Sequence, residues 1–414
     1  MRVLVVGTNR LCHDRLREHG HQMVLFVPRG KARREDPAGP YRHVVIVEDQ
    51  AGIDLWVDVA RAFHRSMRFE AVVAYNEHTY HIVRAISDTL DIPTVVDTGL
   101  FGRVLDKSRM RELLEKHDVP SCRYARATGR EAVLTAIRDI GLPCIVKPVD
   151  GEASLGVARI DSPGDIGAAL QRVGDEHIDR GVLVEEFLVG DEFSVEGISA
   201  GARHHIVAIT KKFRDDMTFV ERGHLVPAPV DAAARESIVS YVERILDVLE
   251  FHDCPSHTEI VLTARGPRII ETHNRIGGDR IGDLVRLATG VDLYDLVARQ
   301  SLGEDVTALL PGRIVPKQSA VVWYADPGGP PANTLLEVRD VERVRALPYV
   351  RQVELLKEPG APQTAVRQSS DRSALAVVVG DTPQEALRRA QEAIRMLTFV
   401  YAWNPEDTAF APGH

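Results

Sequence analysis

The chain has 414 residues, of which 44% are apolar and 27% are charged, so it is long enough to form two to four globular domains. Its net charge of −9 at pH 7 argues against general affinity for nucleic acid or anionic membranes. There is no long apolar run, no signal peptide and no CxxC pair among the four cysteines, so we expect a cytoplasmic protein without disulfides or zinc.

The first hundred residues alternate short apolar runs with amphipathic stretches. The predicted strands are 3–6, 23–27, 44–47 and 71–75, and the predicted helices are 53–65 and 78–90. Strands separated by helices predict βαβ units and a parallel, Rossmann-like sheet. The first strand ends in Gly7-Thr8-Asn9 rather than in GxGxxG, so a dinucleotide site is not expected.

Further along the chain the pattern changes to longer helices and hairpins. The expected elements are a helix at 106–119 capped by Asp106, strands at 143–149, 182–190, 192–199 and 206–210, loops at 150–157 and 211–229, a helix at 231–250, a hairpin at 258–275 and a helical segment at 279–303. A cluster of Pro and Gly at 310–316 marks a domain boundary. After it we expect strands at 319–324, 350–356 and 374–379, and a final helix that begins after Thr382.

Lys147 is the strongest single signal, because only eight of the 51 basic residues are lysines and this one lies inside an apolar strand. A buried ammonium group needs an anionic partner. The loop that follows has Gly151 and Gly156 near its ends and can direct several backbone N–H groups at one anion. These features suit a triphosphate, although a Walker motif is absent. The alternative is a lysine that extends from an edge strand past an ordinary turn.

Glu259 and Glu271 flank a predicted hairpin turn at Ala264-Arg265-Gly266. A three-residue loop with a left-handed Gly266 would place the two acids directly opposite each other, with Cβ atoms about 5 Å apart. Two carboxylates so placed repel each other unless a cation lies between them, and oxygen ligands suit Mg²⁺. A two-residue loop would instead put the acids on opposite faces as solvated edge charges.

Acidic residues crowd the segment 184–196, beside apolar strand residues. A strand end there could offer backbone groups to an adenine edge, and Glu192 could accept hydrogen bonds from ribose hydroxyls. An exposed acidic turn is the commoner explanation of such residues.

Arg275 and Arg280 flank Gly277 and Gly278 just before a predicted helix. Glycines at a helix N-terminus favour anion binding, and arginine adds bidentate recognition of carboxylate or phosphate. The alternative is a helix cap with two surface arginines.

The order of these features resembles the ATP-grasp superfamily. The segments that carry the resemblance are DKSRMRELLEKHDVPSCRY, IVKPVDGEASLGV, VEEFLVGDEFSVE and ETHNR. The resemblance covers residues 1 to about 305, and the tail is similar to the C-terminal domain of the biotin-carboxylase-like branch. It implies an α/β and α+β multidomain protein with an ATP-grasp fold. The implied domains are an N-terminal Rossmann-like domain over 1–105, an ATP-grasp domain over 106–308 with a lid at about 122–186, and a C-terminal α+β domain over 309–414.

The resemblance also implies an ATP site built from several segments. The residues expected to line it are Lys107, Lys147, Glu152, Ser154, Gly156, Glu185, Phe187, Leu188, Glu192 and Lys212. The first two lysines would hold the α- and β-phosphates, and the loop at 150–157 would close over the phosphates. Glu185 and the backbone that follows it would read adenine. Lys211 is an alternative to Lys212 at the γ-phosphate.

By the same resemblance Mg²⁺, or Mn²⁺, would be bound by Glu259 and Glu271, and Arg275 would stabilise charge on the transferred phosphoryl group. The family's metal strand commonly reads E-x-N-x-R, whereas this chain has His273 in the place of the Asn. Imidazole is a poor Mg²⁺ ligand. Either Asn274 substitutes after a backbone adjustment, or the two glutamates hold the metal with additional water.

The stretch 211–229 is similar to the substrate-covering loop of bacterial L-amino acid ligases. The resemblance therefore implies an ATP-dependent carboxylate–amine ligase that forms an amide or peptide bond through an acyl phosphate and releases ADP and phosphate. His224 in this loop could orient the amine or accept its proton, unless it is a surface histidine. Arg280 with the amides of Gly277 and Gly278 could hold a substrate carboxylate.

The expected substrates are amino acids or small carboxylic acids, with no nucleic acid or membrane partner, and a homodimer is expected from the resemblance. Two other functions fit the same residues. One is a carboxylase-type ATP-grasp enzyme that uses bicarbonate, and the other is a catalytically silent nucleotide-binding protein.

Overall fold

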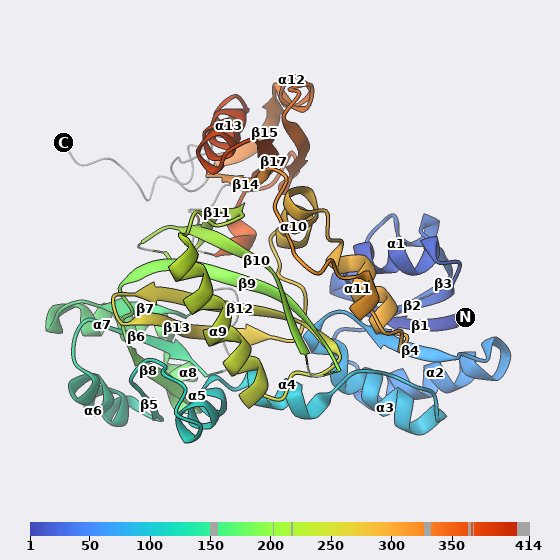
Figure 1. Cartoon of the computed structure of the whole chain (residues 1–414), viewed down its shortest axis with the longest axis horizontal. Helices are drawn as coiled ribbons and strands as arrows, with labels where there is room; N and C mark the ends of the chain where they lie inside the picture. The colour runs from blue at the N-terminus through green and yellow to red at the C-terminus, as the bar shows by residue number, and fades with distance from the viewer. Residues whose placement is uncertain are drawn as a thin grey trace.

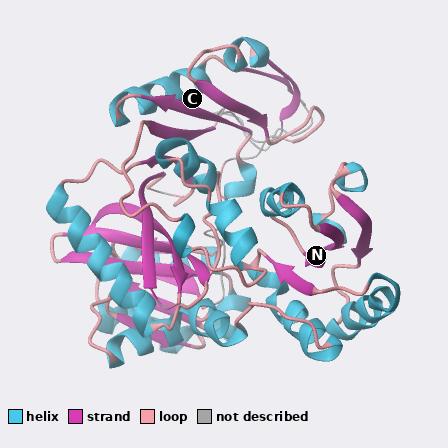
Figure 2. Cartoon of the chain, turned by 45° about the vertical axis from the view of Figure 1, so that its right-hand side comes forward, coloured by secondary structure: helices cyan, strands magenta, loops and turns pink. Residues whose placement is uncertain are grey.

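The computed structural model describes residues 1–149, 156–201, 203–216, 218–326, 333–362, 366 and 368–403. Figure 1 shows an N-terminal parallel sheet with its helices, a small sheet at the other end of the molecule, and a long central sheet that continues into the C-terminal region. Figure 2 shows helices packed around these sheets. Among the described residues, no helix has the length and apolar character that crossing a membrane requires.

The N-terminal sheet has four parallel strands in the order β3-β2-β1-β4. Its elements are β1 (Arg2–Val6), β2 (Gln22–Pro28), β3 (Tyr41–Val47), β4 (Ala71–Ala74), α1 (Arg10–Glu18), α2 (Ile53–Met67) and α3 (Tyr80–Leu90). Successive residues of a strand point to opposite faces, so Leu4 shares a core with α2 and α3, whereas Val5 shares one with α1. The predicted parallel sheet is confirmed.

The small sheet is antiparallel, with strands in the order β5-β8-β6-β7. Its elements are β5 (Tyr124–Ala127), β6 (Cys144–Pro148), β7 (Ala158–Ile160), β8 (Val182–Glu186), α6 (Arg130–Ile140), α7 (Ile166–Val173) and α8 (Asp175–Arg180). Apolar residues of the helices and strands form a separate core. We call this body the lid sheet.

The central sheet is antiparallel and has eight strands in the order β13-β12-β9-β10-β11-β14-β17-β16. These strands are β9 (Gly190–Ala200), β10 (Arg203–Arg214), β11 (Glu221–Val226), β12 (Cys254–Thr263), β13 (Gly266–His273), β14 (Ser319–Ala325), β16 (Val350–Leu355) and β17 (Ala374–Gly380). One face packs on α9 (Ala232–Val248) through residues such as Ile260 and Ile269. The opposite face carries the polar side chains of the site.

The remaining elements join or cover these sheets. They are α4 (Thr98–Leu105), α5 (Lys107–Lys116), α10 (Ile281–Thr289), α11 (Leu293–Gln300), α12 (Val341–Arg345), α13 (Pro383–Arg395), and the strand pair β15 (Asn333–Arg339) and β18 (Thr398–Trp403). As predicted, Asp106 caps α5, because its carboxylate accepts hydrogen bonds from the amides of Ser108 and Arg109.

Two predicted segments are wrong in detail. The helical segment 279–303 is divided into α10 and α11, because Gly290 adopts a left-handed conformation with φ +83° and Asp292 caps the second helix. The loop predicted at 211–229 is largely strand, since β10 runs to Arg214 and β11 begins at Glu221. The polar residues that suggested a loop lie where these strands line the site.

The central sheet crosses the boundary predicted at 308/309. β11 lies before that boundary and pairs in register with β14 after it, so that Gly223 lies opposite Trp323. The C-terminal region is thereby joined to the centre of the chain by backbone hydrogen bonds. The division into three domains stays a proposal.

The junction between β11 and β14 depends on a close approach at Gly223. A Cβ atom there would lie 2.4 Å from Cε3 of Trp323 and 2.6 Å from the carbonyl oxygen of Val322. We predict that Gly223→Ala lowers the free energy of unfolding by about 1–3 kcal/mol, as overpacking does. Urea denaturation followed by circular dichroism measures this, with Gly312→Ala as control, because a Cβ there meets no atom within 4 Å. An equal loss of unfolding free energy in both variants would show that the close approach at Gly223 is not what stabilises the junction.

Candidate active site

Glu259 and Glu271 lie directly opposite each other on β12 and β13. The predicted three-residue loop is wrong, because Thr263 pairs with Gly266 across a two-residue loop. The register shifts by one residue between Ile260 and Glu259, which leaves Ile270 as a β-bulge and restores the pairing of the acids. The predicted juxtaposition is therefore confirmed, but the bulge produces it and not the loop.

Each acid of this pair is held by one lysine. Lys212 Nζ lies 2.7 Å from Glu259 Oε2, and Lys107 Nζ lies 3.0 Å from Glu271 Oε2. Burial raises the pKa of Glu259, but the charge of Lys212 and a hydrogen bond from His257 outweigh burial and hold that pKa well below its ordinary value. Lys107 and His273 lower the pKa of Glu271 in the same way. Both acids are therefore ionised at neutral pH.

A pocket beside the acid pair contains most of the residues predicted to bind ATP. Its lining includes Lys107, Lys147, Glu185, Phe187, Leu188, Glu192, Lys212, Glu259 and Glu271, with Ile145, Val157 and Val261 as apolar walls. Of the two candidate lysines on β10, Lys212 is buried and lines this pocket. Lys211 points to the other face, where it pairs with Asp191 at 2.7 Å, because neighbouring strand residues alternate.

Lys147 is fixed by a buried ion-pair network at one wall of the pocket. Its Nζ lies 2.6 Å from Glu185 Oε2, and Nε of Arg111 donates to Glu185 Oε1 at 3.2 Å. Burial raises the pKa of Glu185, but the charges of Lys147 and Arg111 lower it to about 2. Arg111 also donates to the carbonyl oxygen of the bulge residue Ile270 at 2.8 Å.

Arg111 was missed by the sequence analysis. Its four-residue spacing from Lys107 on one helix face was the signal that could have found it.

The segment that follows Glu185 is held by the backbone as well as by side chains. Lys147 and Arg111 both contact Glu185, and the amide of Phe187 donates to the carbonyl oxygen of Pro143. The backbone of this segment is thus held in place at the pocket wall.

Lys212 lies at the centre of a second cluster of charges. Besides Glu259, its Nζ contacts Glu192 at 3.0 Å and Glu221 at 3.4 Å, and Glu192 also pairs with Arg214 at 2.8 Å. Burial lowers the pKa of Lys212, but the surrounding carboxylates raise it well above its ordinary value, so the ammonium group is retained. Glu221 was not predicted, because it lay in a segment interpreted as loop.

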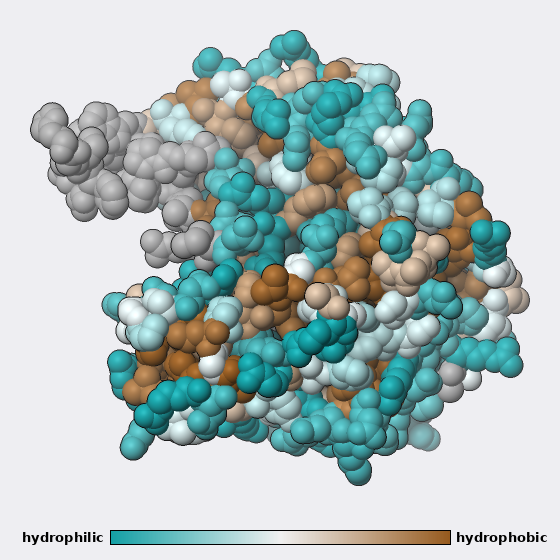
Figure 3. Space-filling model, turned by 60° about the vertical axis from the view of Figure 1, so that its left-hand side comes forward, coloured by the Kyte–Doolittle hydropathy of each residue, from teal (hydrophilic) through white to brown (hydrophobic). Residues whose placement is uncertain are grey.

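A second pocket shares the acid pair as a wall with the first. Both are lined by Lys107, Lys212, Glu221, Glu259 and Glu271, and the second adds Asn76, Glu77, His224, Arg275, Gly278 and Asp279. Figure 3, which turns the side with the lid sheet forward, shows this face hollowed, with hydrophilic residues gathered in the hollow. The two pockets therefore meet at Glu259 and Glu271.

Arg275 lines the second pocket and is held by a carboxylate from the N-terminal region. Its Nε donates to Glu77 Oε2 at 3.3 Å, and Nδ1 of His273 lies 2.9 Å from Glu77 Oε1. Burial raises the pKa of Glu77, but His273 and Arg275 lower it to about 2. Sequence reasoning missed Glu77, although its position just after the carboxyl end of β4, a common place for ligand-binding residues, was a signal.

His224 is buried, which excludes the surface alternative, and lies on the wall of the second pocket. Its Nε2 is 3.4 Å from Asp279 Oδ2, and both guanidinium Nη atoms of Arg372 donate to Asp279 at 2.7 Å. The guanidinium of Arg372 also stacks 3.7 Å from the ring centroid of Tyr324. No local pattern pointed to Arg372, because it lies 93 residues from its partner.

Several predicted residues are not brought to the acid pair. Asn274 lines a different cavity, beside Tyr75 and Gln300, so its placement does not support a ligand role. Arg280 pairs with Glu354 and lies 3.7 Å from Asp283.

The glycines that were predicted to contact substrate or phosphate lie in different surroundings. Gly277 packs against His257, with Gly278 on the pocket wall. Gly156 is left-handed, with φ +71°, and packs on Pro148. Glu152 and Ser154 lie outside the described residues.

The donor chemistry of the acid pair fits a divalent cation. Two ionised carboxylates on one face supply the oxygen ligands that Mg²⁺ and Mn²⁺ prefer. Within the described ranges, no group of three or more His, Cys, Asp and Glu side chains is arranged to hold a metal alone. A metal at Glu259 and Glu271 would therefore need further oxygens, such as those of phosphate and water.

Comparisons with known families agree with this geometry. Residues 140–283 match the ATP-grasp domain, and residues 330–402 match L-amino acid ligase C-terminal domain 2. The chain is 28% identical over 353 residues to uncharacterized protein y4rH of Sinorhizobium fredii, and the aligned stretch covers 84% of this chain and 72% of that protein. It is 29% identical over 215 residues to alanine–anticapsin ligase of Bacillus subtilis. This second alignment covers 46% of this chain and 45% of that ligase, which is less than half of its length.

The fold is similar to the crystal structure of L-amino acid ligase from Bacillus licheniformis, with a TM-score of 0.84, 21% identity, and coverage of 97% of this chain and 98% of that chain. The chain contains an ATP-grasp domain and an L-amino acid ligase C-terminal domain 2. In this combination and in its fold it resembles the L-amino acid ligases, and the recognition made from the sequence is confirmed at this level. An ATP-grasp domain implies the use of ATP and a divalent metal.

The network around Glu185 predicts a specific acid sensitivity. Because the pKa of Glu185 is lowered from 4.5 to about 2 in the folded state, its contribution to stability is present above about pH 4.5 and is lost as the pH falls toward 2. We predict that Glu185→Gln costs about 3 kcal/mol at pH 7 and progressively less toward pH 2. Denaturation curves across this range, with the exposed Glu176→Gln as control, measure the difference. A cost that stays constant with pH would contradict the ionised pair.

Proposed function

We propose that this chain is an ATP-dependent carboxylate–amine ligase that forms an amide or peptide bond through an acyl phosphate. One observation carries the proposal: two pockets meet at Glu259 and Glu271. The first pocket has the lysines and the strand-end backbone that suit a nucleotide. The second has an arginine and a buried histidine that suit a carboxylate and an amine. A phosphoryl group could pass between the two at the shared wall.

The first pocket provides the charges that a triphosphate needs. Lys107, Lys147 and Lys212 reach it from α5, the lid sheet and the central sheet, and in this structure each is paired with a carboxylate. Phosphate oxygens are alternative partners for the same ammonium groups. Because the three lysines come from three separate elements, they would contact a triphosphate from different sides.

Glu259 and Glu271 would hold Mg²⁺, which neutralises charge on phosphate oxygens and acts as a Lewis acid. The two ionised carboxylates support Mg²⁺ at this position. Mn²⁺ has similar ligand preferences and is the alternative.

The second pocket suits both steps of the reaction. A carboxylate oxygen of the donor attacks the γ-phosphorus, and the bond to the bridging oxygen breaks to release ADP. The amine nitrogen then attacks the acyl carbon, the C–O bond to phosphate breaks, and the amine loses a proton. Arg275, which lines this pocket, would stabilise negative charge on the phosphoryl group. His224, on the same wall, would accept the proton.

Amino acids are the proposed substrates, as the names of the alanine–anticapsin ligase and L-amino acid ligase relatives suggest. The charged lining of the second pocket supports this class, because a zwitterionic amino acid offers one group of each sign. We also propose a homodimer. A cytoplasmic location is proposed because four free cysteines are suited to a reducing compartment.

The proposal predicts that ADP forms from Mg-ATP only when a carboxylate and an amine are both present, and that a condensed product appears in the mass spectrum. Pools of amino acids and small carboxylic acids are screened, with bicarbonate tested separately. Glu271→Gln should reduce turnover at least a hundredfold, because one metal-binding carboxylate is lost, with circular dichroism confirming the fold. The exposed Glu236→Gln serves as control and should keep full activity.

ADP release with bicarbonate alone would favour a carboxylase instead. Binding of ATP with no ADP release from any pool would favour a silent nucleotide-binding protein.

A second prediction concerns His224. If it accepts the amine proton, His224→Asn should lower the rate of the amine-dependent step by about 10²- to 10⁴-fold, while the dissociation constant of ATP stays unchanged. Rapid-quench kinetics with isothermal titration calorimetry separate the two. Unchanged amine-dependent turnover would exclude the role.

A further inference from the structure

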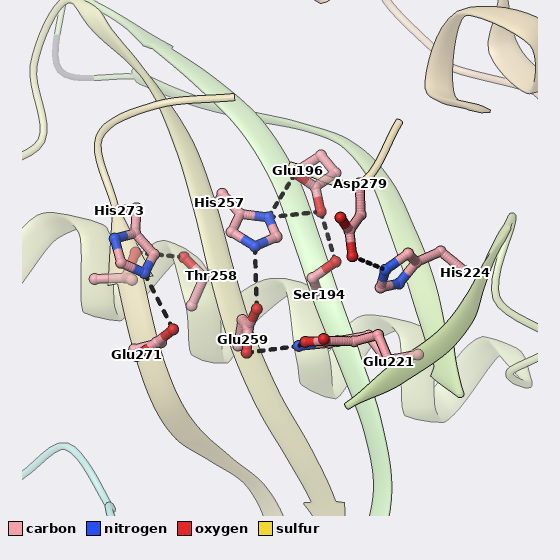
Figure 4. Close-up of polar contacts among 12 residues, drawn as sticks. Ser194, Glu196, Glu221, His224, His257, Thr258, Glu259, Glu271, His273 and Asp279 are labelled. Atoms are coloured by element: carbon pink, nitrogen blue, oxygen red, sulfur yellow. Dashed lines mark hydrogen bonds and ion pairs between the residues drawn. The ribbon is translucent and has the colours of Figure 1, made fainter. Parts of the chain in front are cut away.

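Two short chains of hydrogen bonds and ion pairs lead from the acid pair into the protein, and they have the same composition. In each chain a histidine joins one acid of the pair to a second, buried glutamate. His257 joins Glu259 to Glu196, and His273 joins Glu271 to Glu77. Figure 4 shows the two imidazole rings side by side above the acids.

The first chain lies wholly within the central sheet. Nε2 of His257 is 3.3 Å from Glu259 Oε1, and its Nδ1 is 2.9 Å from Glu196 Oε2. Glu196 has no exposed surface and also accepts a hydrogen bond of 2.7 Å from the hydroxyl of Ser194. Gly277 closes over the pair, since a Cβ atom there would lie 2.8 Å from Nδ1 of His257. The ring therefore has little freedom to turn.

The second chain crosses from the central sheet to the N-terminal region. Nε2 of His273 is 3.2 Å from Glu271 Oε1, and its Nδ1 is 2.9 Å from Glu77 Oε1. Glu77 is also held by Arg275. The position of Glu271 is thus tied to a residue that follows β4, almost two hundred positions away in the chain.

The two acids divide their oxygen atoms in the same way. In each, Oε1 faces a histidine and Oε2 faces a lysine, which is Lys212 for Glu259 and Lys107 for Glu271. The two lysines line both pockets, whereas the two histidines line only the second. A histidine that holds Oε1 fixes the rotation of the carboxylate. Oε2 therefore keeps its orientation toward the first pocket.

We propose that His257 and His273 are positioning residues that orient the two metal-binding carboxylates, each anchored by its own buried glutamate. The inference rests on the proposed function, because it requires a divalent metal at the acid pair. It assigns no ligand role to either ring. Groups that orient ligating side chains commonly change metal affinity 10- to 100-fold when they are removed.

A purely structural role for these histidines would have the same appearance but a different consequence. The matched control lies between the same two strands on their other face, where the hydroxyls of Thr258 and Thr272 form a buried hydrogen bond of 2.7 Å. Thr258→Val removes that bond at nearly constant volume. It loosens the hairpin without touching the carboxylates.

The experiment measures Mn²⁺ binding to the full chain by electron paramagnetic resonance in the presence of ADP. Wild type is compared with His257→Ala, His273→Ala, the two corresponding Gln variants, Thr258→Val and Glu271→Gln. We expect the Ala variants to bind Mn²⁺ about 10- to 100-fold more weakly. The Gln variants keep one N–H donor and should lie between these and wild type. If an Ala variant does not fold, its Gln partner decides.

Steady-state kinetics give an independent readout. In the histidine variants the Mn²⁺ concentration for half-maximal activity should rise by the same factor, whereas kcat at saturating metal changes much less. Thr258→Val should bind Mn²⁺ as wild type does. Unchanged binding in all histidine variants, or equal weakening in Thr258→Val, would overturn the positioning role alone. Unchanged binding in Glu271→Gln would show that the metal lies elsewhere and would overturn the proposed metal site as well.

Discussion

The site depends on one electrostatic constraint, which is that two ionised carboxylates lie directly opposite each other on neighbouring strands. Like unit charges about 5 Å apart repel by roughly 3 kcal/mol at an effective dielectric constant of 20, and cross-strand pairs of like charge are destabilising. The protein offsets this repulsion with Lys107 and Lys212, which each contact one acid. The acid pair therefore exists only where other segments bring cations to it.

The residues around the acid pair also come from separate parts of the chain. Lys147 comes from the lid sheet, Glu77 from just beyond the N-terminal sheet, and Arg372 from the C-terminal region next to β17. The stretch that matches the ATP-grasp domain, residues 140–283, contains the acid pair but none of Glu77, Lys107 and Arg372. The walls of the two pockets are thus completed by residues outside that domain.

The sequence predicted the parts of the site that local pattern determines. A lysine in an apolar strand, acids on either side of a turn, and strand and helix periodicity correctly indicated the positions of Lys147, Glu259 and Glu271. It did not predict how the acids come to face each other, because a bulge at Ile270 has no reliable signature in one sequence. The choice of Lys212 over Lys211 required knowing which strand face points to the pocket.

Partners that lie far apart in the chain could not be found from one sequence. Arg372 binds Asp279 across 93 residues, and Glu77 binds His273 across 196. Neither pair leaves a spacing that a periodicity argument can use. The same reason applies to Arg280. Its predicted role in binding an anion did not take account of Glu354, which lies on a strand of the C-terminal region and pairs with it.

In the proposed reaction a carboxylate is activated as an acyl phosphate at the acid pair. The most direct measurement uses a donor substrate whose carboxylate carries ¹⁸O, with mass spectrometry of the phosphate released in one turnover. Attack of the carboxylate on the γ-phosphorus predicts one ¹⁸O atom in each phosphate, because the C–O bond breaks in the second step. Unlabelled phosphate released together with the condensed product would show that the second carboxylate oxygen leaves by another route, and would exclude an acyl phosphate.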